Sequence, residues 1–279
     1  MRKLFCEINP FCYQISLKKE RFKRRIKNVV NNNKIAKEKT SKEFPYVIKG
    51  HSSIILRKLY GVDFKLQENK VTNIELACNK INGLVIHPNE IFSFWKTIGY
   101  PSKRHGYKEG LVIKKNRVLD KGYGGGLCQM ANLVHYLVLN SPLEVVELHH
   151  HSDALFPDER RRVPFGTGTS VLFNHVDYRF KNNLKFDIQL LTWVDDGVVY
   201  GELRAVNDIP NRYKLVEEDH HFKKEDDKYY RISKVYKITI NKKNNKEIKK
   251  ELILDNHSLV MYDYNLIPEK EIRNDWCNK

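Results

Sequence analysis

GYGGGLCQMANLVHYLVLNSP, residues 122–142, places a run of glycines directly before an apolar helical pattern. The chain has 14 glycines in 279 residues, and four of them fall in this stretch. The apolar residues that follow share one helical face, which predicts a helix from about Leu127 to Leu139. Pro142 ends this helix, because the residue before a proline is pushed out of the helical region. We therefore expect the fold to be organised around the junction between the glycines and this helix.

The sequence before the glycines predicts one more helix and two short strands. In residues 68–83 the apolar positions recur at three- and four-residue steps and stop at Asn82-Gly83. The runs LVIHP (84–88) and EIFSFW (90–95) favour strands, separated by Pro88-Asn89. Residues 1–45 are basic and rich in Asn without a sustained apolar stripe, so they predict a basic N-terminal arm.

After residue 142 the hydrophobic period changes from 3.6 to 2, which indicates strands. The strand-like runs are LEVVELHHHS (143–152), TSVLFNHVDYRF (169–180), FDIQLLTWV (186–194), VVYGELRAV (198–206) and YYRISKVYKITI (229–240). The turn Asp195-Asp196-Gly197 joins two of them. The order predicts an α+β fold: N-terminal helices, a glycine loop and a central helix packed on a largely antiparallel sheet. By analogy, this resembles a papain- or transglutaminase-like core.

The composition indicates a folded protein with a large basic excess. Hydrophobic residues make up 41% of the chain, and its length suffices to bury a core. The formal net charge of +16 favours anionic partners, such as an acidic polymer or a negatively charged membrane face. No zinc-finger spacing or RNA-binding aromatic signature is present, so no specific nucleic acid is expected. An anionic membrane surface stays open as a partner.

The cysteines and the N-terminus bear on the cellular compartment. The five cysteines have no repeating spacing and are interpreted as free thiols. The N-terminal 25 residues lack the clean apolar segment of a secretory signal, and no stretch approaches the roughly 18 apolar residues of a membrane span. We therefore expect a cytoplasmic protein, with a peripheral position at the inner membrane face as the alternative.

Cys128 and the glycines before it fit a nucleophilic site. A helix N-terminus carries partial positive charge, so a cysteine in the first turn tends toward the reactive thiolate. Gly124, Gly125 and Gly126 would let a substrate carbonyl approach backbone amides that act as an oxyanion hole, and Gln129 adds a side-chain donor. The alternative is a loop that merely turns the chain, with Cys128 as a small buried residue.

The two strands predicted next carry candidate partners for a nucleophile. Alternation puts His149 and His151 on one face of residues 143–151, and His175 and Asp177 together in residues 171–180. A helix that begins near Cys128 and packs on both strands would bring Cys, His and Asp together in chain order. Each histidine taken alone favours a structural or surface role over a catalytic one. Zinc is an alternative ligand for Cys and His, but the spacing matches no structural zinc pattern, so no metal or cofactor is expected.

These motifs resemble the VanW family. The resemblance rests on GGGLCQMANLVHYLVLNSPLEVVELHHHSDALFPD (124–158), PFGTGTSVLFNHVDYRFKN (164–182) and the lead-in QENKVTNIELACNKINGLVIHPNEIFSFWKTIG (67–99). It covers about residues 67–183 and continues weakly into the C-terminal strands. We therefore expect a VanW-like domain over residues 46–279, with a motif core at 67–183 and C-terminal strands at 184–279.

The resemblance implies an activity and assigns roles. Multidomain, membrane-anchored members of the family are implicated as cysteine transpeptidases that cross-link peptidoglycan through a thioester. For this chain that implies Cys128 as the nucleophile, His151 as the base and Asp177 as its orienter, with His149 and Ser152 beside the substrate. The family name also implies a link to glycopeptide resistance.

Two departures from the family pattern limit that implication. Larger members usually have Gly-x-Asp-Ala-Thr-Val where this chain reads GTGTSV (166–171), so that acid is absent. The lack of an export signal favours a peptide or cell-wall precursor as substrate, for acyl transfer or amide hydrolysis. A non-catalytic accessory or binding protein on the same scaffold is the alternative.

Overall fold

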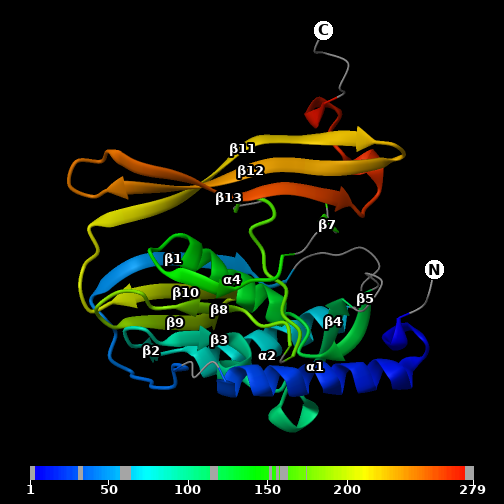
Figure 1. Ribbon diagram of the computed structural model, residues 1–279, viewed down its shortest axis with the longest axis horizontal. Coiled ribbons are helices and arrows are strands. Elements are labelled where there is room, and N and C mark those ends of the chain that lie inside the picture. Colours follow the sequence, from blue (N-terminus) through cyan, green and yellow to red (C-terminus); the bar gives the residue numbers. More distant parts are fainter. Residues whose placement is uncertain are drawn as a thin grey trace.

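A computed structural model describes residues 4–30, 34–56, 64–113, 119–150, 153–154, 157, 163–173 and 175–273. The fold is mixed α+β with mostly antiparallel sheets, which confirms the predicted class. Figure 1 shows a lower body, in which helices pack on short strands, and an upper sheet of three long strands. No helix in the described ranges is long and apolar enough to cross a membrane.

The lower body contains both predicted helices. Its helices and 3-10 turns are η1 (Phe5–Glu7), α1 (Pro10–Val30), α2 (Phe64–Ile81), α3 (Phe94–Ile98), η2 (Lys103–His105) and α4 (Leu127–Leu139). α2 and α4 are the helices expected from the apolar periodicity. Their apolar faces meet in one core, which includes Ile74 and Ile81 of α2 and Met130 and Leu137 of α4, all fully buried. α1 lies within the segment expected to be an N-terminal arm.

The central sheet packs against α4. Its strand order is β1 (Tyr46–Ile54), β10 (Val198–Ala205), β9 (Ile188–Asp195) and β2 (Leu84–Ile86), and every neighbouring pair is antiparallel. β9 and β10 are the predicted hairpin, whose turn residues Asp196 and Gly197 both have positive φ. Gly201 of β10 faces α4, where a Cβ would lie 3.1 Å from Leu133. The helix therefore sits close against the sheet.

Two smaller sheets complete the lower body. They are β3 (Ile91–Ser93), β8 (Arg179–Lys181) and β6 (Glu144–Glu147), and the pair β4 (Glu109–Ile113) and β5 (Leu119–Tyr123). The predicted strand over 143–151 is shorter than expected, because β6 ends at Glu147. The predicted strand over 169–180 is wrong in its first part: Leu172 and Val176 close a local turn, and the strand begins at Arg179.

The upper sheet, called here the hairpin sheet, is built from the C-terminal strands. Its order is β14 (Ile272–Arg273), β11 (Asn211–Glu225), β12 (Lys228–Asn241), β13 (Glu247–Val260) and β7 (Asp153–Ala154). The 3-10 turns η4 (Tyr264–Leu266) and η5 (Glu269–Glu271) lie between β13 and β14. The two short end strands pair in parallel with their neighbours. Because β7 comes from the segment after β6, the chain that follows α4 links the two parts.

Candidate functional site

The glycine loop before α4 is packed against neighbouring backbone and leaves no room for side chains. A Cβ on Gly125 would lie 2.5 Å from the carbonyl carbon of Gly110, and one on Gly126 would lie 2.4 Å from Cγ of Lys70. Gly124 and Gly126 also have φ of +83° and +99°, a region that side chains disfavour. The glycines therefore let the loop pack directly on β4 and α2.

Asn73 of α2 anchors this loop from below and is fully buried. Its Nδ2 donates to the carbonyl oxygens of Gly125 and Lys108, both at 3.0 Å, and its Oδ1 accepts from the Lys108 amide at 2.8 Å. One side chain thus ties the helix, the glycine loop and the approach to β4 together. Sequence reasoning missed Asn73, because a single Asn inside a helical pattern has no spacing signal.

Cys128 is the second residue of α4, and Gly126 is the N-cap. Its side chain is half-buried, and Sγ donates a long hydrogen bond of 3.7 Å to the carbonyl oxygen of Val171. Burial raises the pKa of the Cys128 thiol, with the Val171 hydrogen bond as a smaller effect. Burial thus favours the neutral thiol, in the direction opposite to the shift toward the thiolate expected from the helix N-terminus.

The amides around Cys128 already have local partners. The Leu127 amide donates to Gly124 at 3.2 Å, and the Gln129 amide donates to Gly126 at 2.9 Å. The Gln129 side chain reaches the end of β1, where Nε2 donates to Ser53 Oγ and to the Ile54 carbonyl, both at 2.8 Å. Both hydrogens of this side-chain amide are thus engaged with β1.

Asp177 is almost completely buried and accepts four hydrogen bonds. Its carboxylate receives Ser93 Oγ at 2.6 Å, the Trp95 amide at 3.0 Å, the Tyr178 amide at 3.0 Å and Arg179 Nε at 2.7 Å. In the described part of the chain, no imidazole is among these donors. The carboxylate therefore joins α3 to β8.

Glu147 connects the Asp177 region to α1 and to His149. Arg24 of α1 makes an ion pair with Glu147, His149 Nε2 lies 3.1 Å from the same carboxylate, and Arg179 Nε lies 3.5 Å away. Burial alone would raise the pKa of Glu147, but the hydrogen bonds from Arg24 and His149 outweigh it and lower that pKa. The carboxylate is thus held ionised and keeps the His149 ring beside β6.

A short strap of chain, residues 167–171, lies between α4 and His149. The Thr169 amide donates to Asn132 Oδ1 of α4 at 2.7 Å, and the Ser170 amide donates to the His149 carbonyl at 2.7 Å. The next residue, Val171, accepts the Cys128 thiol. The structure therefore brings the backbone of His149 near Cys128. His151 and Ser152 lie outside the described residues, so their predicted roles stay predictions.

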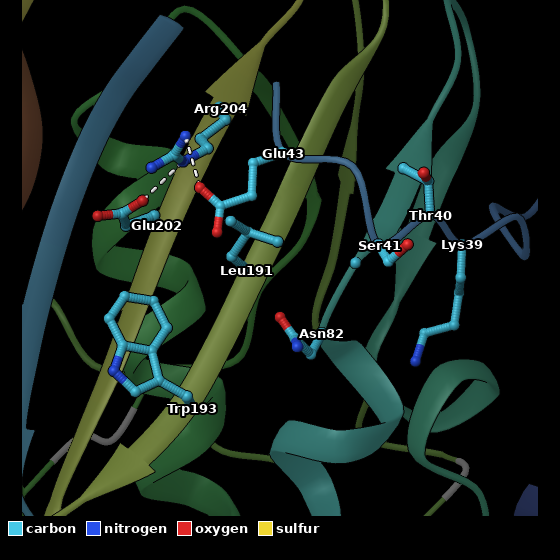
Figure 2. Close-up of a pocket in the computed structure, with 10 residues that line it drawn as sticks. Lys39, Thr40, Ser41, Glu43, Asn82, Leu191, Trp193, Glu202 and Arg204 are labelled. Atoms are coloured by element: carbon cyan, nitrogen blue, oxygen red, sulfur yellow. Dashed lines mark hydrogen bonds and ion pairs between the residues drawn. The ribbon is translucent and has the colours of Figure 1, made fainter. Parts of the chain in front are cut away.

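A separate pocket lies on the face of the central sheet opposite α4 (Figure 2). It has a volume of about 580 Å³ and lies between β9, β10, the end of α2 and residues 39–43. Arg204 pairs there with Glu43 at 3.0 Å and with Glu202 at 2.7 Å, and the Trp193 ring stacks on Tyr200 at 5.3 Å. No predicted site residue lines this pocket.

Among the described residues, no group of three or more His, Cys, Asp or Glu side chains is arranged to hold a metal ion. In these ranges Cys128 pairs with a carbonyl and His149 with a carboxylate.

Comparison with known proteins identifies relatives of the matched region. The model of the family described as VanW like protein matches residues 69–204. The chain is 28% identical over 199 residues to Vancomycin B-type resistance protein VanW of Enterococcus faecalis, covering 71% of this chain and 72% of that protein. It is 29% identical over 150 residues to the uncharacterized protein YoaR of Bacillus subtilis, covering 50% of this chain and 48% of that protein. No solved structure matches the chain.

Proposed function

The chain belongs to the VanW family, and from this premise we propose that it performs cysteine-dependent acyl transfer or amide hydrolysis on a peptide or cell-wall precursor. The relative from Enterococcus faecalis is named for vancomycin resistance, and we assign this chain to a process of that kind. One observation supports the chemistry above others: a half-buried thiol in the first turn of α4, directly after a loop of glycines.

The raised pKa of Cys128 determines the kind of mechanism. A neutral thiol must lose its proton as it attacks, so the reaction needs a general base. Sγ forms a bond to the carbonyl carbon, the base takes the thiol proton, and that proton passes to the leaving amine as the C–N bond breaks. Water or an acceptor amine then attacks the thioester and restores the thiol. The choice between water and amine separates hydrolysis from transpeptidation of peptidoglycan-type peptides.

We propose His151 as the base, on the family resemblance, and His149 as a residue beside the substrate. The strap supports this arrangement, because Ser170 bonds the His149 carbonyl and Val171 accepts the Cys128 thiol. His151 follows His149 by two residues. The chain therefore passes close to the thiol just before the proposed base.

Asp177 acts in this proposal as a positioning residue. Its carboxylate holds Arg179, and Arg179 in turn lies 3.5 Å from Glu147, the partner of His149. The proposed architecture is analogous to papain- and transglutaminase-like enzymes, in which a cysteine begins a helix packed on an antiparallel sheet. Here α4 supplies the helix and β10 the nearest strand.

Intact-protein mass spectrometry tests the acyl-enzyme directly. Purified protein is incubated with synthetic cell-wall stem peptides, and hydroxylamine is added to half of each sample. Wild type should gain the mass of an acyl group that hydroxylamine removes, as a thioester requires. Cys128→Ala should gain none, His151→Ala should form the adduct much more slowly, and Cys6→Ser should match wild type. An adduct that persists in Cys128→Ala would overturn the assignment.

A non-catalytic binding role is the second candidate, and the pocket beside Trp193 favours it. This pocket offers a ring that is 39% exposed and paired charges, and it does not include Cys128. Isothermal titration with the same stem peptides separates the two candidates. Binding that is unchanged in Cys128→Ala but lost in Trp193→Ala, together with no acyl adduct in wild type, would favour the binding role.

A further inference from the structure

One side of α1 docks on the lower body. Arg24 is buried and pairs with Glu147, and one turn later Asn28 Oδ1 accepts from Arg179 Nη2 at 2.9 Å. Figure 1 shows α1 running along the edge of the lower body, so a second side of the helix faces outward.

The outward side of α1 is an apolar stripe, called here the α1 stripe. Its residues are each between 40% and 80% exposed, and they are Phe11, Ile15, Phe22, Ile26 and Val29. At about 100° per residue these positions fall within roughly 60° of one another, nearly opposite Arg24. Single exposed apolar residues are ordinary, but a stripe of five along one helix indicates a surface that binds something.

Basic side chains border the α1 stripe on both sides. The same helical geometry places Lys18 and Arg25 along one border and Lys19 and Lys23 along the other, with Lys27 about 40° beyond Lys23. All five are exposed. In total α1 holds seven Lys or Arg residues and one acid, Glu20, which pairs with Lys23 at 3.0 Å. The outward side of the helix is thus apolar along its centre and cationic along its borders.

We propose that α1 docks this protein on an anionic lipid surface, with the helix lying flat in the headgroup region. Apolar side chains of such a helix enter the acyl boundary, while the lysines beside them extend to lipid phosphates. A helix of 21 residues is about 31 Å long, so all five stripe residues can meet the surface together.

Charge argues for lipid over a second copy of the chain. Two α1 stripes packed face to face would bring their lysine borders together, and that repulsion opposes association. An anionic bilayer neutralises both borders and still accepts the apolar centre. Membrane binding requires no rearrangement of α1. Arg24 and Asn28 hold the helix on the lower body, and the α1 stripe already faces outward.

Co-sedimentation with vesicles tests the proposal. Full-length protein is mixed with phosphatidylcholine vesicles that contain either no or about one third phosphatidylglycerol. We expect binding to the anionic vesicles that falls as salt is added, and little binding to the neutral ones. Ile15→Ser/Phe22→Ser should reduce the affinity about tenfold or more, because two large apolar side chains no longer enter the lipid. Lys19→Gln/Lys23→Gln should reduce binding to anionic vesicles only.

Matched control variants distinguish vesicle binding by α1 from nonspecific binding through other exposed apolar residues. Ile248→Ser and Leu252→Ser remove exposed apolar side chains from β13 of the hairpin sheet and should bind like wild type. Cys128→Ala should also bind like wild type, since the inference is independent of the proposed chemistry. Equal vesicle binding by Ile15→Ser/Phe22→Ser, in a variant with an unchanged melting temperature, would overturn the proposal. So would a stripe-dependent dimer that ignores vesicles, seen by light scattering.

Discussion

Cys128 and Asp177, the first and last residues of the predicted catalytic set, lie in opposite surroundings. Asp177 is 1% exposed and accepts four hydrogen bonds, whereas Cys128 is half-buried and donates one long hydrogen bond to a carbonyl. A carboxylate whose acceptor positions are all occupied by hydrogen-bond donors can accept a new hydrogen bond only by losing an existing one. Asp177 is therefore part of the structural framework, whereas the Cys128 thiol is held by a single weak contact.

The strongest test of this contrast is Asp177→Ala. It removes the nearer of the two carboxylates beside the buried Arg179 guanidinium, which keeps only Glu147 at 3.5 Å, and it removes the acceptor of Ser93 Oγ. We expect a loss of about 3–5 kcal/mol in the free energy of unfolding, measured by urea denaturation. Asp177→Asn should lose less, because an amide oxygen still accepts.

The exposed turn residue Asp196 supplies the control for Asp177. Its φ of +42° suits asparagine, so Asp196→Asn should stay within about 0.5 kcal/mol of wild type. A wild-type-like unfolding curve for Asp177→Ala would contradict the framework role and would return Asp177 to the catalytic set.

The next test concerns the loop on the Cys128 side. Gly125→Ala would place a methyl group 2.5 to 2.7 Å from backbone atoms of Gly110 and Leu111. Because backbone cannot move aside cheaply, we expect a loss of about 1–3 kcal/mol. Gly50→Ala is the control, since its Cβ would meet only Glu202 Cγ at 3.8 Å. Thermal unfolding of both variants measures the difference, and equal melting temperatures would show that the loop yields.

His135 lies between the Cys128 and Asp177 regions, and its burial predicts that the stability of the protein depends on pH. It lies on α4 seven residues after Cys128, and its Nδ1 is 3.1 Å from the hydroxyl of Tyr178, the neighbour of Asp177. Burial, with a smaller effect from His150, lowers the pKa of His135 from 6.5 to about 3. As the pH falls below about 6.5, the imidazole of His135 is therefore protonated in the unfolded chain but stays neutral in the folded chain.

Stability from His135 is thus present above pH 6.5 and is lost as the pH falls toward 3. The loss reaches at most about 1.4 kcal/mol per pH unit inside this window. His135→Gln should flatten the decline of the urea midpoint between pH 7 and pH 5. Tyr178→Phe keeps the buried imidazole and should retain the wild-type slope. An equal slope in His135→Gln would mean that other groups set the acid sensitivity.

Sequence reasoning located the elements whose signals are local. The apolar periods of α2 and α4, and the Asp-Gly turn between β9 and β10, depend on nearby residues and were confirmed. The sequence of residues 171–178 alternates like a strand, yet Leu172 and Val176 bond each other in a local turn. From α3, the Phe94 amide donates to the Tyr178 carbonyl and Trp95 Nε1 donates to that of Val176. Such tertiary hydrogen bonds override a strand pattern.

The site was predictable only in part for the same reason. The glycine run before an apolar helix placed Cys128 in the first turn of α4, as the structure shows. Two of the four donors of Asp177, Ser93 Oγ and the Trp95 amide, come from positions 84 and 82 residues earlier in the chain, so no local pattern could reveal them. The α1 stripe escaped notice because Lys18 and Lys19 interrupt it between Ile15 and Phe22.

The smallest expected effect on stability completes the contrast and concerns Cys128 itself. Cys128→Ser exchanges one weak donor for another in a half-buried position, so its free energy of unfolding should stay within about 1 kcal/mol of wild type, against the large loss for Asp177→Ala.

Because burial raises the pKa of the thiol, the rate of alkylation of wild-type Cys128 by iodoacetamide should still be increasing at pH 9, as measured by peptide mass spectrometry. A midpoint below pH 8 would mean that an imidazole already holds the thiolate in the resting protein. In that case the base would deprotonate Cys128 before substrate binds. The nucleophile would then be a preformed thiolate–imidazolium pair, and not a thiol that loses its proton during the attack.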